Sequence, residues 1–279
     1  MITRASVISH EIPRHEMTFP LVELYHTTMA RDGAIVPAET SVLCEGCGYT
    51  LDGLPTTGHC PECGLDIAKS RAEGDGRQPP PWEDPAAGGR NPLSRFVRTT
   101  VQVVLRPARF YRTLQTRRDD DDTAALHFAR AHWLISASLL AGALSIHAYW
   151  FQLYQAGPRL PGGPWIFWAV MAVVTYTFLW GTTRLAARLT AWEAAYRGLR
   201  LPLPVVLRGL YYHAAHYLPV ALVAFATVDA YWFAVKWRWI AETTAVRYLF
   251  VLCAEVLVAA GYLFKTYWTG MKNTMYANR

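Results

Sequence analysis

Two long uncharged stretches restrict the possible folds of this chain more than any other feature of its sequence. Between Arg130 and Arg159 there are 28 consecutive positions without Asp, Glu, Lys or Arg, and between Arg159 and Arg184 there are 24 more. A helix needs about 20 mainly apolar residues to cross the roughly 30 Å of hydrocarbon in a bilayer. Because both stretches exceed that length and are rich in Leu, Ile, Val, Ala and Phe, each predicts a membrane-spanning helix.

Two further apolar stretches follow, and each is interrupted by charged residues. Residues 209–235 contain Asp229, and residues 245–264 contain Arg247 and Glu255. One acidic residue costs about 2.5–3.5 kcal/mol in a spanning helix, which the surrounding Leu, Val and Phe offset. The sequence therefore predicts an α-helical integral membrane protein. Its transmembrane domain is expected at 123–272, with four transmembrane helices at about 133–154, 164–183, 211–235 and 245–266.

The composition agrees with this fold class and separates the chain into two parts. Hydrophobic residues make up 52% and charged residues 17%, whereas soluble domains average about 25% charged. Residues 1–90 hold 7 Lys or Arg against 13 Asp or Glu, whereas residues 123–279 hold 13 against 4. Basic residues within apolar sequence indicate membrane flanks rather than a nucleic-acid surface. We therefore expect a lipid bilayer around the second part and no nucleic-acid partner.

The distribution of Lys and Arg predicts the orientation of the four spans. Eight lie in the flank at 95–130, five in the loop at 184–208 and three after residue 264, whereas the other two loops hold four together. Because cytoplasmic loops carry the excess of positive charge, both termini are expected in the cytoplasm, with the spans in the bacterial inner (cell) membrane. Aromatic residues are expected to form belts at the membrane interfaces. Those at the outer ends include Trp165, Trp168, Trp237 and Trp239, and those at the inner ends are Trp133, Trp180, Tyr211, Tyr212, Tyr267 and Trp268.

Four cysteines in the acidic N-terminal part have the spacing of a metal site. Cys44, Cys47, Cys60 and Cys63 form the pattern C-x2-C-x12-C-x2-C. Two thiolates separated by two residues can both point inward from one tight turn, and two such turns complete a tetrahedron around one ion. A glycine follows each pair, where the chain turns back and a positive φ is useful. The twelve residues between the pairs are enough for a short hairpin, and the metal is expected to supply much of the folding energy.

The sequence CEGCGYTLDGLPTTGHCPECG resembles the zinc ribbon, whose knuckles commonly read CxxCG and CPxCG. The resemblance covers residues 42–67 and implies a small zinc-ribbon β module at 41–68 with one structural zinc ion. Rubredoxin-like ribbons share the pattern and hold iron, so an iron ribbon is an alternative. Two disulfides are another, although a reducing cytosol favours metal-bound thiolates and the N-terminus has no apolar core of a signal peptide. A closed set of four thiolates has no open position for catalysis.

Three further segments flank the cysteine module. Residues 1–40 show no sustained hydrophobic period and are predicted to be flexible, and Met29 is an alternative start of the chain. Residues 69–92 are dense in Pro, Gly and charge and are predicted to form a linker. Residues 93–122 mix apolar residues with seven arginines. They are predicted to form an amphipathic segment at the inner membrane interface, with a soluble linker helix as the alternative.

The membrane part also resembles the Yip-type family of multi-pass membrane domains. The residues that carry this resemblance are LRPARFYRTL at 105–114 and LRLPLPVVLRGLYYHAAHYLPVAL at 199–222. Those domains usually have five spans, whereas four are predicted here. The resemblance implies a role in membrane organisation or trafficking and no catalytic residues. A zinc ribbon ahead of such a body resembles bacterial multi-pass membrane proteins of unassigned function.

Three ionisable residues are predicted within the spans. At a rise of about 1.5 Å per residue, His147 lies roughly 10 Å, Asp229 roughly 6 Å and Glu255 roughly 13 Å from the outer edge of the hydrocarbon. A polar cluster in the outer half of the bundle is therefore one interpretation, and such residues are candidates for a proton relay or an ion site. The structural alternative is a hydrated Asp229 and a protonated Glu255 that bonds a neighbouring helix. His213 and His216 lie near the inner end and are expected at the interface rather than as metal ligands.

These features support three functional hypotheses. The leading hypothesis is a non-enzymatic inner-membrane protein whose cytoplasmic zinc ribbon binds a protein partner. The second is a small transporter or proton-coupled channel that uses Glu255, Asp229 and His147. The third is a redox protein with an iron ribbon. The sequence contains no Gly-rich phosphate loop, no G-x-S-x-G elbow and no H-E-x-x-H motif, so we expect no enzymatic activity.

Overall fold

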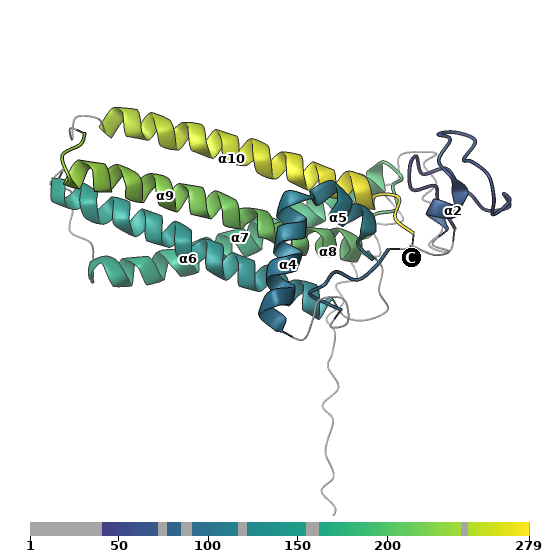
Figure 1. The fold of residues 1–279 in the computed structure, drawn as a ribbon, viewed down its shortest axis with the longest axis horizontal. Helices are drawn as coiled ribbons and strands as arrows, with labels where there is room; N and C mark the ends of the chain where they lie inside the picture. Colours follow the sequence, from purple (N-terminus) through teal and green to yellow (C-terminus); the bar gives the residue numbers. More distant parts are fainter. Residues whose placement is uncertain are drawn as a thin grey trace, which may run out of the picture.

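A computed structural model of the protein describes residues 41–71, 77–84, 91–116, 122–154, 162–240 and 245–278. The segment at 1–40, predicted to be flexible, lies outside these residues. Long helices lie side by side and make up most of the structure, and the cysteine module lies at one end of them (Figure 1). This end of the bundle is called the module end, and the opposite end is called the far end.

The bundle consists of four apolar rods. Three of them are the helices α6 (Thr123–Tyr154), α7 (Gly163–Tyr196) and α10 (Ala245–Thr274). The fourth is formed by α8 (Leu203–His213), the single turn η1 (Ala214–His216) and α9 (Tyr217–Lys236), which follow one another without a gap. The apolar rods are 32, 34, 34 and 30 residues long in chain order, and about 20 residues are enough to cross a bilayer. The prediction of four long apolar helices is therefore confirmed.

The rods extend past the predicted spans at the module end. α6 begins at Thr123 rather than at about 133, and α7 continues to Tyr196 rather than ending at about 183. The additional turns contain Arg130 and Arg184. Arginine is a good helix former, so a charge marks the edge of the hydrocarbon without interrupting the backbone hydrogen bonds. The charge pattern therefore gives the extent of the uncharged stretch but not the end of the helix.

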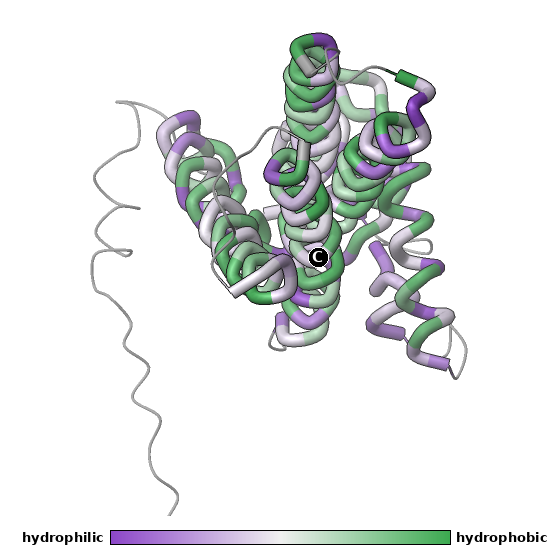
Figure 2. Tube along the Cα trace, turned by 90° about the vertical axis from the view of Figure 1, so that its left-hand side faces the viewer, coloured by the Kyte–Doolittle hydropathy of each residue, from purple (hydrophilic) through white to green (hydrophobic). Residues whose placement is uncertain are grey.

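The rods expose apolar side chains on their outer surfaces. α6 packs against α7 and α9, whereas α10 contacts α5 and α8 more extensively than α9. Only 6% of the most apolar stretch of α10 is buried. Viewed along the rods, the helices carry many hydrophobic residues (Figure 2), and large apolar side chains such as Val173, Phe178 and Leu257 are exposed. An apolar exterior of this extent is unusual for a soluble protein and is expected where the surrounding solvent is lipid.

Two short helices, α4 (Pro92–Leu105) and α5 (Pro107–Thr113), precede the first rod. The side chain of Asn91 caps α4 by accepting a hydrogen bond from the Leu93 N–H at 2.9 Å. The proline that opens α5 lacks an N–H and disfavours a helical conformation in the residue before it. This proline therefore separates α4 from α5 and allows a change of direction. α4 crosses the rods at a steep angle (Figure 1).

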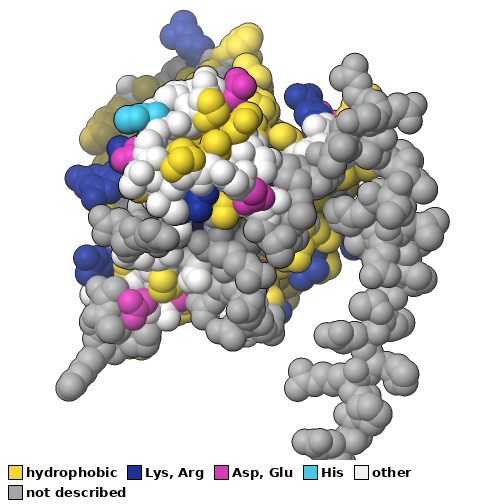
Figure 3. All heavy atoms as spheres, turned by 90° about the vertical axis from the view of Figure 1, so that its right-hand side faces the viewer, with side chains coloured by type: hydrophobic (Ala, Val, Ile, Leu, Met, Phe, Trp, Pro, Cys, Tyr) yellow, Lys and Arg dark blue, Asp and Glu magenta, His cyan; other side chains and the backbone are white. Residues whose placement is uncertain are grey.

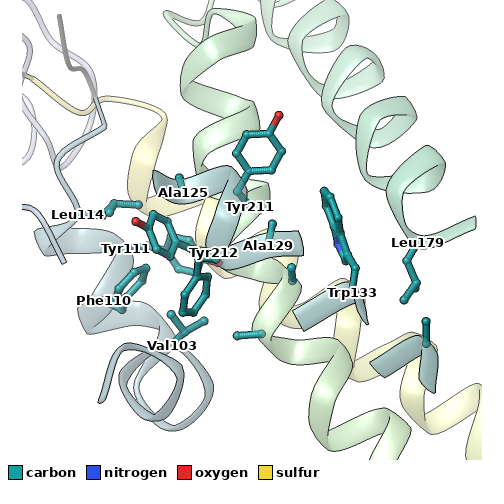
Figure 4. Close-up of a cluster of buried hydrophobic side chains, with 14 residues drawn as sticks. Val103, Phe110, Tyr111, Leu114, Ala125, Ala129, Trp133, Leu179, Tyr211 and Tyr212 are labelled. Atoms are coloured by element: carbon teal, nitrogen blue, oxygen red, sulfur yellow. The ribbon is translucent and has the colours of Figure 1, made fainter. Parts of the chain in front are cut away.

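The largest buried cluster lies at the module end, where α4, α5, α6 and α8 meet (Figure 4). Its largest side chains are Tyr111, Phe128, Trp133 and Tyr212, all fully buried. Trp133, Tyr211 and Tyr212, predicted to lie in the inner aromatic belt, belong to this cluster instead. The reason is that neighbouring elements cover them: the Phe110 ring of α5 lies 5.3 Å from Tyr212, and the Tyr176 ring of α7 lies 6.2 Å from Trp133.

Residues 77–84 of the predicted linker at 69–92 pack against this cluster, whereas its two ends take part in α2 and α4. The ring of Trp82 lies 5.8 Å from that of Phe96 and 6.1 Å from that of Phe128. Its indole N–H donates a hydrogen bond to the Ala124 carbonyl at 2.7 Å. Composition predicts a linker here, but Trp82 packs the segment against the cluster, because a large aromatic side chain buries a large apolar area.

Arg208 of α8 holds the same segment and the start of α6 against the bundle. This residue is 1% exposed, and its guanidinium contacts Glu83 at 2.6 Å and Asp122 at 2.7 Å. Its Nε donates to the Gln115 carbonyl at 2.7 Å, and the Tyr212 hydroxyl donates to the other oxygen of Glu83. Removal of one partner from a buried ion pair costs about 3–5 kcal/mol, because it leaves a charge without compensation.

Candidate metal centre

The two cysteine pairs lie on two similar backbone turns. The N–H of Gly48 donates to the Cys44 carbonyl at 2.8 Å, and the N–H of Gly64 donates to the Cys60 carbonyl at 2.9 Å. The φ angles of these glycines are 81° and 71°, in the left-handed region that side chains disfavour. Each turn therefore needs glycine at this position to bring its two sulfurs to the same side.

The four sulfurs are close enough to share one ion. The Sγ atoms of Cys44 and Cys63 are 3.5 Å apart, those of Cys47 and Cys60 are 3.7 Å apart, and all four lie within 4.8 Å of one another. With a Zn–S bond of about 2.3 Å, a regular tetrahedron of sulfurs has edges of about 3.8 Å. A disulfide would need a separation of about 2.05 Å, and all four cysteines are free. These residues fit a tetrahedral metal ion, and two disulfides do not describe this structure.

The two turns differ in the pKa of their cysteine thiols. Burial raises the pKa of the Cys60 thiol. Hydrogen bonds from the backbone N–H groups of Cys63 and Glu62 act in the opposite direction, and the pKa is lowered to about 7. At the first turn burial raises the pKa of Cys47 to about 12, in spite of a backbone hydrogen bond from Tyr49. Metal ligation requires deprotonated thiols, and a bound cation supplies the charge that favours them. The pKa of Cys60 is therefore lower than that of Cys47 before any cation is bound.

A small apolar core lies beside the sulfurs. Leu51 and Ile67 are buried together with Cys44 and Cys60. Ile67 opens the short helix α2 (Ile67–Ser70), which Asp66 caps by accepting a hydrogen bond from the Ala68 N–H at 3.0 Å. So few apolar residues cannot form a stable core alone, which agrees with a fold that depends on metal.

The predicted hairpin between the cysteine pairs does not form. Backbone pairing in the module is confined to isolated bridges across each turn, Leu43 with Thr50 and His59 with Asp66, and the described residues contain no strand. The intervening segment TLDGLPTTGH contains two glycines and a proline, which disfavour a regular ladder. The expected β module is therefore a pair of knuckles joined by irregular chain.

The module rests on the residues that follow α10. The Asn278 side chain donates to the carbonyls of Leu43 and Ser70, each at 2.7 Å, and accepts from the Leu43 N–H at 3.0 Å. Arg200, from the loop between α7 and α8, donates to the Asn278 side chain at 3.0 Å and also to the Ser41 carbonyl. Asn278 and Arg200 are both buried. The first knuckle is thus paired with the C-terminal end of the described chain.

Arg77 connects the module with two helices. Its guanidinium pairs with both carboxylate oxygens of Glu45, at 2.9 and 3.1 Å. It also donates to the Tyr111 and Leu114 carbonyls at the end of α5 and to the Asn273 carbonyl of α10, at 2.9, 3.2 and 2.9 Å. Bidentate pairs between arginine and carboxylate are among the stronger and more directional protein hydrogen bonds. The cysteine module is therefore held in one orientation on the bundle.

The segment between the knuckles remains accessible. Residues 52–59 are exposed except for Leu54, and His59 lies outside the group of four sulfurs. Seen from the module end, acidic, basic and hydrophobic side chains are interspersed on the described surface (Figure 3). This mixed surface is unlike the apolar exterior of the rods.

The three ionisable residues predicted within the spans occupy separate positions. The Nδ1 atom of His147 lies 3.2 Å from the Tyr248 hydroxyl. Asp229 is exposed on α9. Glu255 lies between α9 and α10, and neither of its carboxylate oxygens has a hydrogen-bond partner. No hydrogen bond within the described part of the chain joins any two of the three, so they do not form a bonded cluster.

His213 and His216 are buried against α10 rather than placed at an interface. The Nε2 atom of His213 lies 3.0 Å from the Thr266 hydroxyl, and the Nδ1 atom of His216 lies 2.7 Å from the Tyr262 hydroxyl. These contacts give each ring a polar partner on α10. They hold the η1 turn against α10 within the bundle.

Comparison with protein-family models, with curated proteins and with solved structures gave no match. The chain is therefore described by its own features. It has four apolar helices long enough to cross a membrane and four clustered cysteines that can bind a metal ion.

Sequence patterns did not reveal the residues that seat the module on the bundle. Arg77, Arg200 and Asn278 lie in segments with the composition of a linker, a loop and a tail. Arg208 did carry a signal, because it follows the apolar run LPLPVVL. A buried charge is unfavourable without a partner, and the partners of the buried Arg208 are Glu83 and Asp122.

Proposed function

We propose that this chain is a non-enzymatic integral protein of the bacterial inner membrane, in which a cytoplasmic module with one structural zinc ion binds a protein partner. The proposal rests chiefly on four cysteine sulfurs within 4.8 Å of one another at the end of a bundle of apolar rods. Four thiolates satisfy the tetrahedral preference of zinc and leave no position for a substrate. A structural role of the ion therefore suits this ligand set better than catalysis.

The ion would hold the two knuckles together, since few apolar contacts do so. The contacts of Asn278 and Arg77 support a module that acts as a fixed part of the membrane protein. A partner would then meet the exposed residues 52–59 and the surrounding end of the bundle. The resemblances to zinc ribbons and to the Yip-type family favour a role in membrane organisation or partner recruitment.

Metal analysis of the purified protein tests the identity of the ion. We expect one zinc per chain and no visible colour. Cys60→Ser removes one ligand and should lower the zinc content, whereas Cys253→Ser, which replaces a cysteine outside the cluster, should not. Stoichiometric iron with thiolate-to-iron absorption would contradict the proposal and support the redox alternative.

Reporter fusions test the orientation. The excess of Lys and Arg at the module end supports a cytoplasmic module. Fusions after residues 122, 195 and 279 should therefore report the cytoplasm, and fusions near 159 and 242 the periplasm. A periplasmic C-terminus would indicate an odd number of spans and contradict this topology.

Co-purification tests the recruitment of a partner. A partner should be enriched with the wild-type chain and with Cys253→Ser, but lost with Cys60→Ser, because only the last variant disturbs the knuckles. The whole chain is used because the module packs against the bundle through Arg77 and Asn278. Identical sets of proteins with all three chains would argue against recruitment by the module.

A further inference from the structure

An apolar groove between α9 and α10 contains the carboxylate of Glu255. Its volume is about 210 Å³, and its walls are formed by Pro219, Val220 and Val223 of α9 and by Val258, Ala259 and Tyr262 of α10. Val223 and Val258 are 55% and 72% exposed. The groove therefore opens sideways on the surface of the bundle, where lipid is the surrounding solvent.

The carboxylate of Glu255 has no hydrogen-bond partner among the described residues, although both of its oxygens are shielded from the surface. The nearby polar side chains on the same face of α10 have partners elsewhere. The Tyr262 hydroxyl lies 2.7 Å from His216, and the Tyr248 hydroxyl lies 3.2 Å from His147. An unpaired carboxylate in apolar surroundings is unfavourable, and a cation in the groove would compensate its charge.

Among the described residues, no Lys or Arg lies at the depth of Glu255. This residue lies ten positions after the start of α10 at Ala245, which corresponds to about 15 Å along the helix and to about half of the hydrocarbon thickness. Arg247 and Lys236 lie near the far end, and Lys265 lies about 15 Å further along α10 towards the module end. A second copy of the chain has the same distribution of charges. Self-association therefore cannot provide the missing positive charge.

We propose that this groove binds a lipophilic ammonium ion that enters from the bilayer. The positive charge pairs with Glu255, and the hydrocarbon part contacts Val223 and Val258. The ring of Tyr262 provides an aromatic face for the cation. Pockets for drug-sized ligands measure about 300–1,000 Å³, so the smaller groove selects compact amines. This site is separate from the cysteine module and does not depend on the proposed metal.

Equilibrium binding to the full chain in nanodiscs of zwitterionic lipid tests the site. The probe is radiolabelled benzyltrimethylammonium, and its uncharged counterpart is neopentylbenzene, in which carbon replaces the nitrogen. We expect saturable binding of one probe per chain and no competition by neopentylbenzene. Glu255→Gln keeps the size of the side chain and removes its charge, so binding should weaken about tenfold or more, the scale of one lost charge-assisted contact.

Two further variants separate the groove from general effects of charge. Asp229→Asn removes an exposed carboxylate of α9 that does not line the groove, and this variant should bind the probe like the wild type. Val223→Trp fills the groove and leaves Glu255 in place, so it should abolish binding even if Glu255→Gln fails to fold. Thermal unfolding and mass photometry of each variant report folding and oligomeric state.

Several outcomes would overturn the proposal. One is that a folded Glu255→Gln or Val223→Trp variant binds the probe as well as the wild type does. Another is that the folded wild type shows no saturable binding of the probe. A wild-type dimer that fails to bind the probe and becomes monomeric with Val223→Trp would identify a second copy as the occupant of the groove.

Discussion

Two glycines of the cysteine module have the same place in the motif but different surroundings. Gly48 and Gly64 each follow a cysteine pair and each adopt a positive φ. A Cβ atom on Gly48 would lie 2.5 Å from the Tyr276 ring, whereas a Cβ atom on Gly64 would meet nothing within 4 Å. Gly64 is therefore needed for its turn, and Gly48 is needed both for its turn and for contact with the residues after α10.

We expect Gly48→Ala to destabilise the metal-loaded protein more than Gly64→Ala. Both variants carry a left-handed alanine, at a cost of about 1–2 kcal/mol, but only Gly48→Ala also displaces Tyr276, and overpacking adds about 1–3 kcal/mol. Thermal unfolding measures the difference, and the double variant Gly48→Ala, Tyr276→Ala should lose the additional cost of the clash. Equal unfolding temperatures for the two single variants would show that contact with Tyr276 does not stabilise the protein.

Among the helices, α4 presents an apolar stripe that nothing in the described structure covers. Thr99 and Val103 face the bundle and are buried. The stripe consists of residues four positions apart, Leu93, Val97, Val101 and Leu105, which are 66%, 50%, 47% and 71% exposed. Because α4 crosses the rods (Figure 1), it runs along the membrane plane if the rods span the membrane. These features fit the predicted interfacial segment, although Phe110 and Leu114 of that segment belong to the core.

A spin label on the stripe of α4 should contact lipid. We expect a label at Val101→Cys to be more accessible to oxygen than to a water-soluble nickel chelate, and a label at Arg98→Cys to show the reverse. The reason is that an interfacial helix places apolar residues in the acyl boundary and arginines among the headgroups. Power-saturation spectra in nanodiscs, in a Cys253→Ser chain with its metal retained, provide the measurement. Aqueous accessibility at both positions would support a soluble helix instead.

For the protein as a whole, the module and the bundle are joined by buried polar contacts of Asn278, Arg77 and Arg200. Removal of the metal should unfold the knuckles, because small metal modules are unfolded without their ion. The rods should remain helical, because their backbone hydrogen bonds are internal and are satisfied in lipid. The metal is thus expected to stabilise the fold at the module end rather than the entire protein.

When the knuckles unfold, the residues after α10 lose their contacts with them, and carboxypeptidase digestion can detect this loss. Chelation should accelerate removal of the residues around Asn278, while the far-UV circular dichroism signal changes little. Asn278→Ala, with metal bound, should be digested quickly without a chelator, because it lacks the bonds to Leu43 and Ser70. Digestion at an unchanged rate after complete removal of the metal would show that docking does not depend on the ion.

The apolar rods and the sulfur cluster were both accessible from sequence patterns. A spanning helix depends on uncharged length, since lipid requires backbone hydrogen bonds to be satisfied within the segment. The two cysteine turns are equally local, because Gly48 and Gly64 close them within five residues. The hairpin expected between the pairs was wrong, because spacing permits a strand pair but does not require one.

Packing alone decided how these parts fit together. The bonds of Asn278 to Leu43 and of Arg77 to Asn273 join residues 235 and 196 positions apart. Asp229 and Glu255 are both predicted in the outer half of the bundle, yet Asp229 is exposed and Glu255 lies in the groove. Rise along a helix determines depth, whereas rotation about its axis depends on contacts with neighbouring helices. Those contacts exist only once the whole chain is folded.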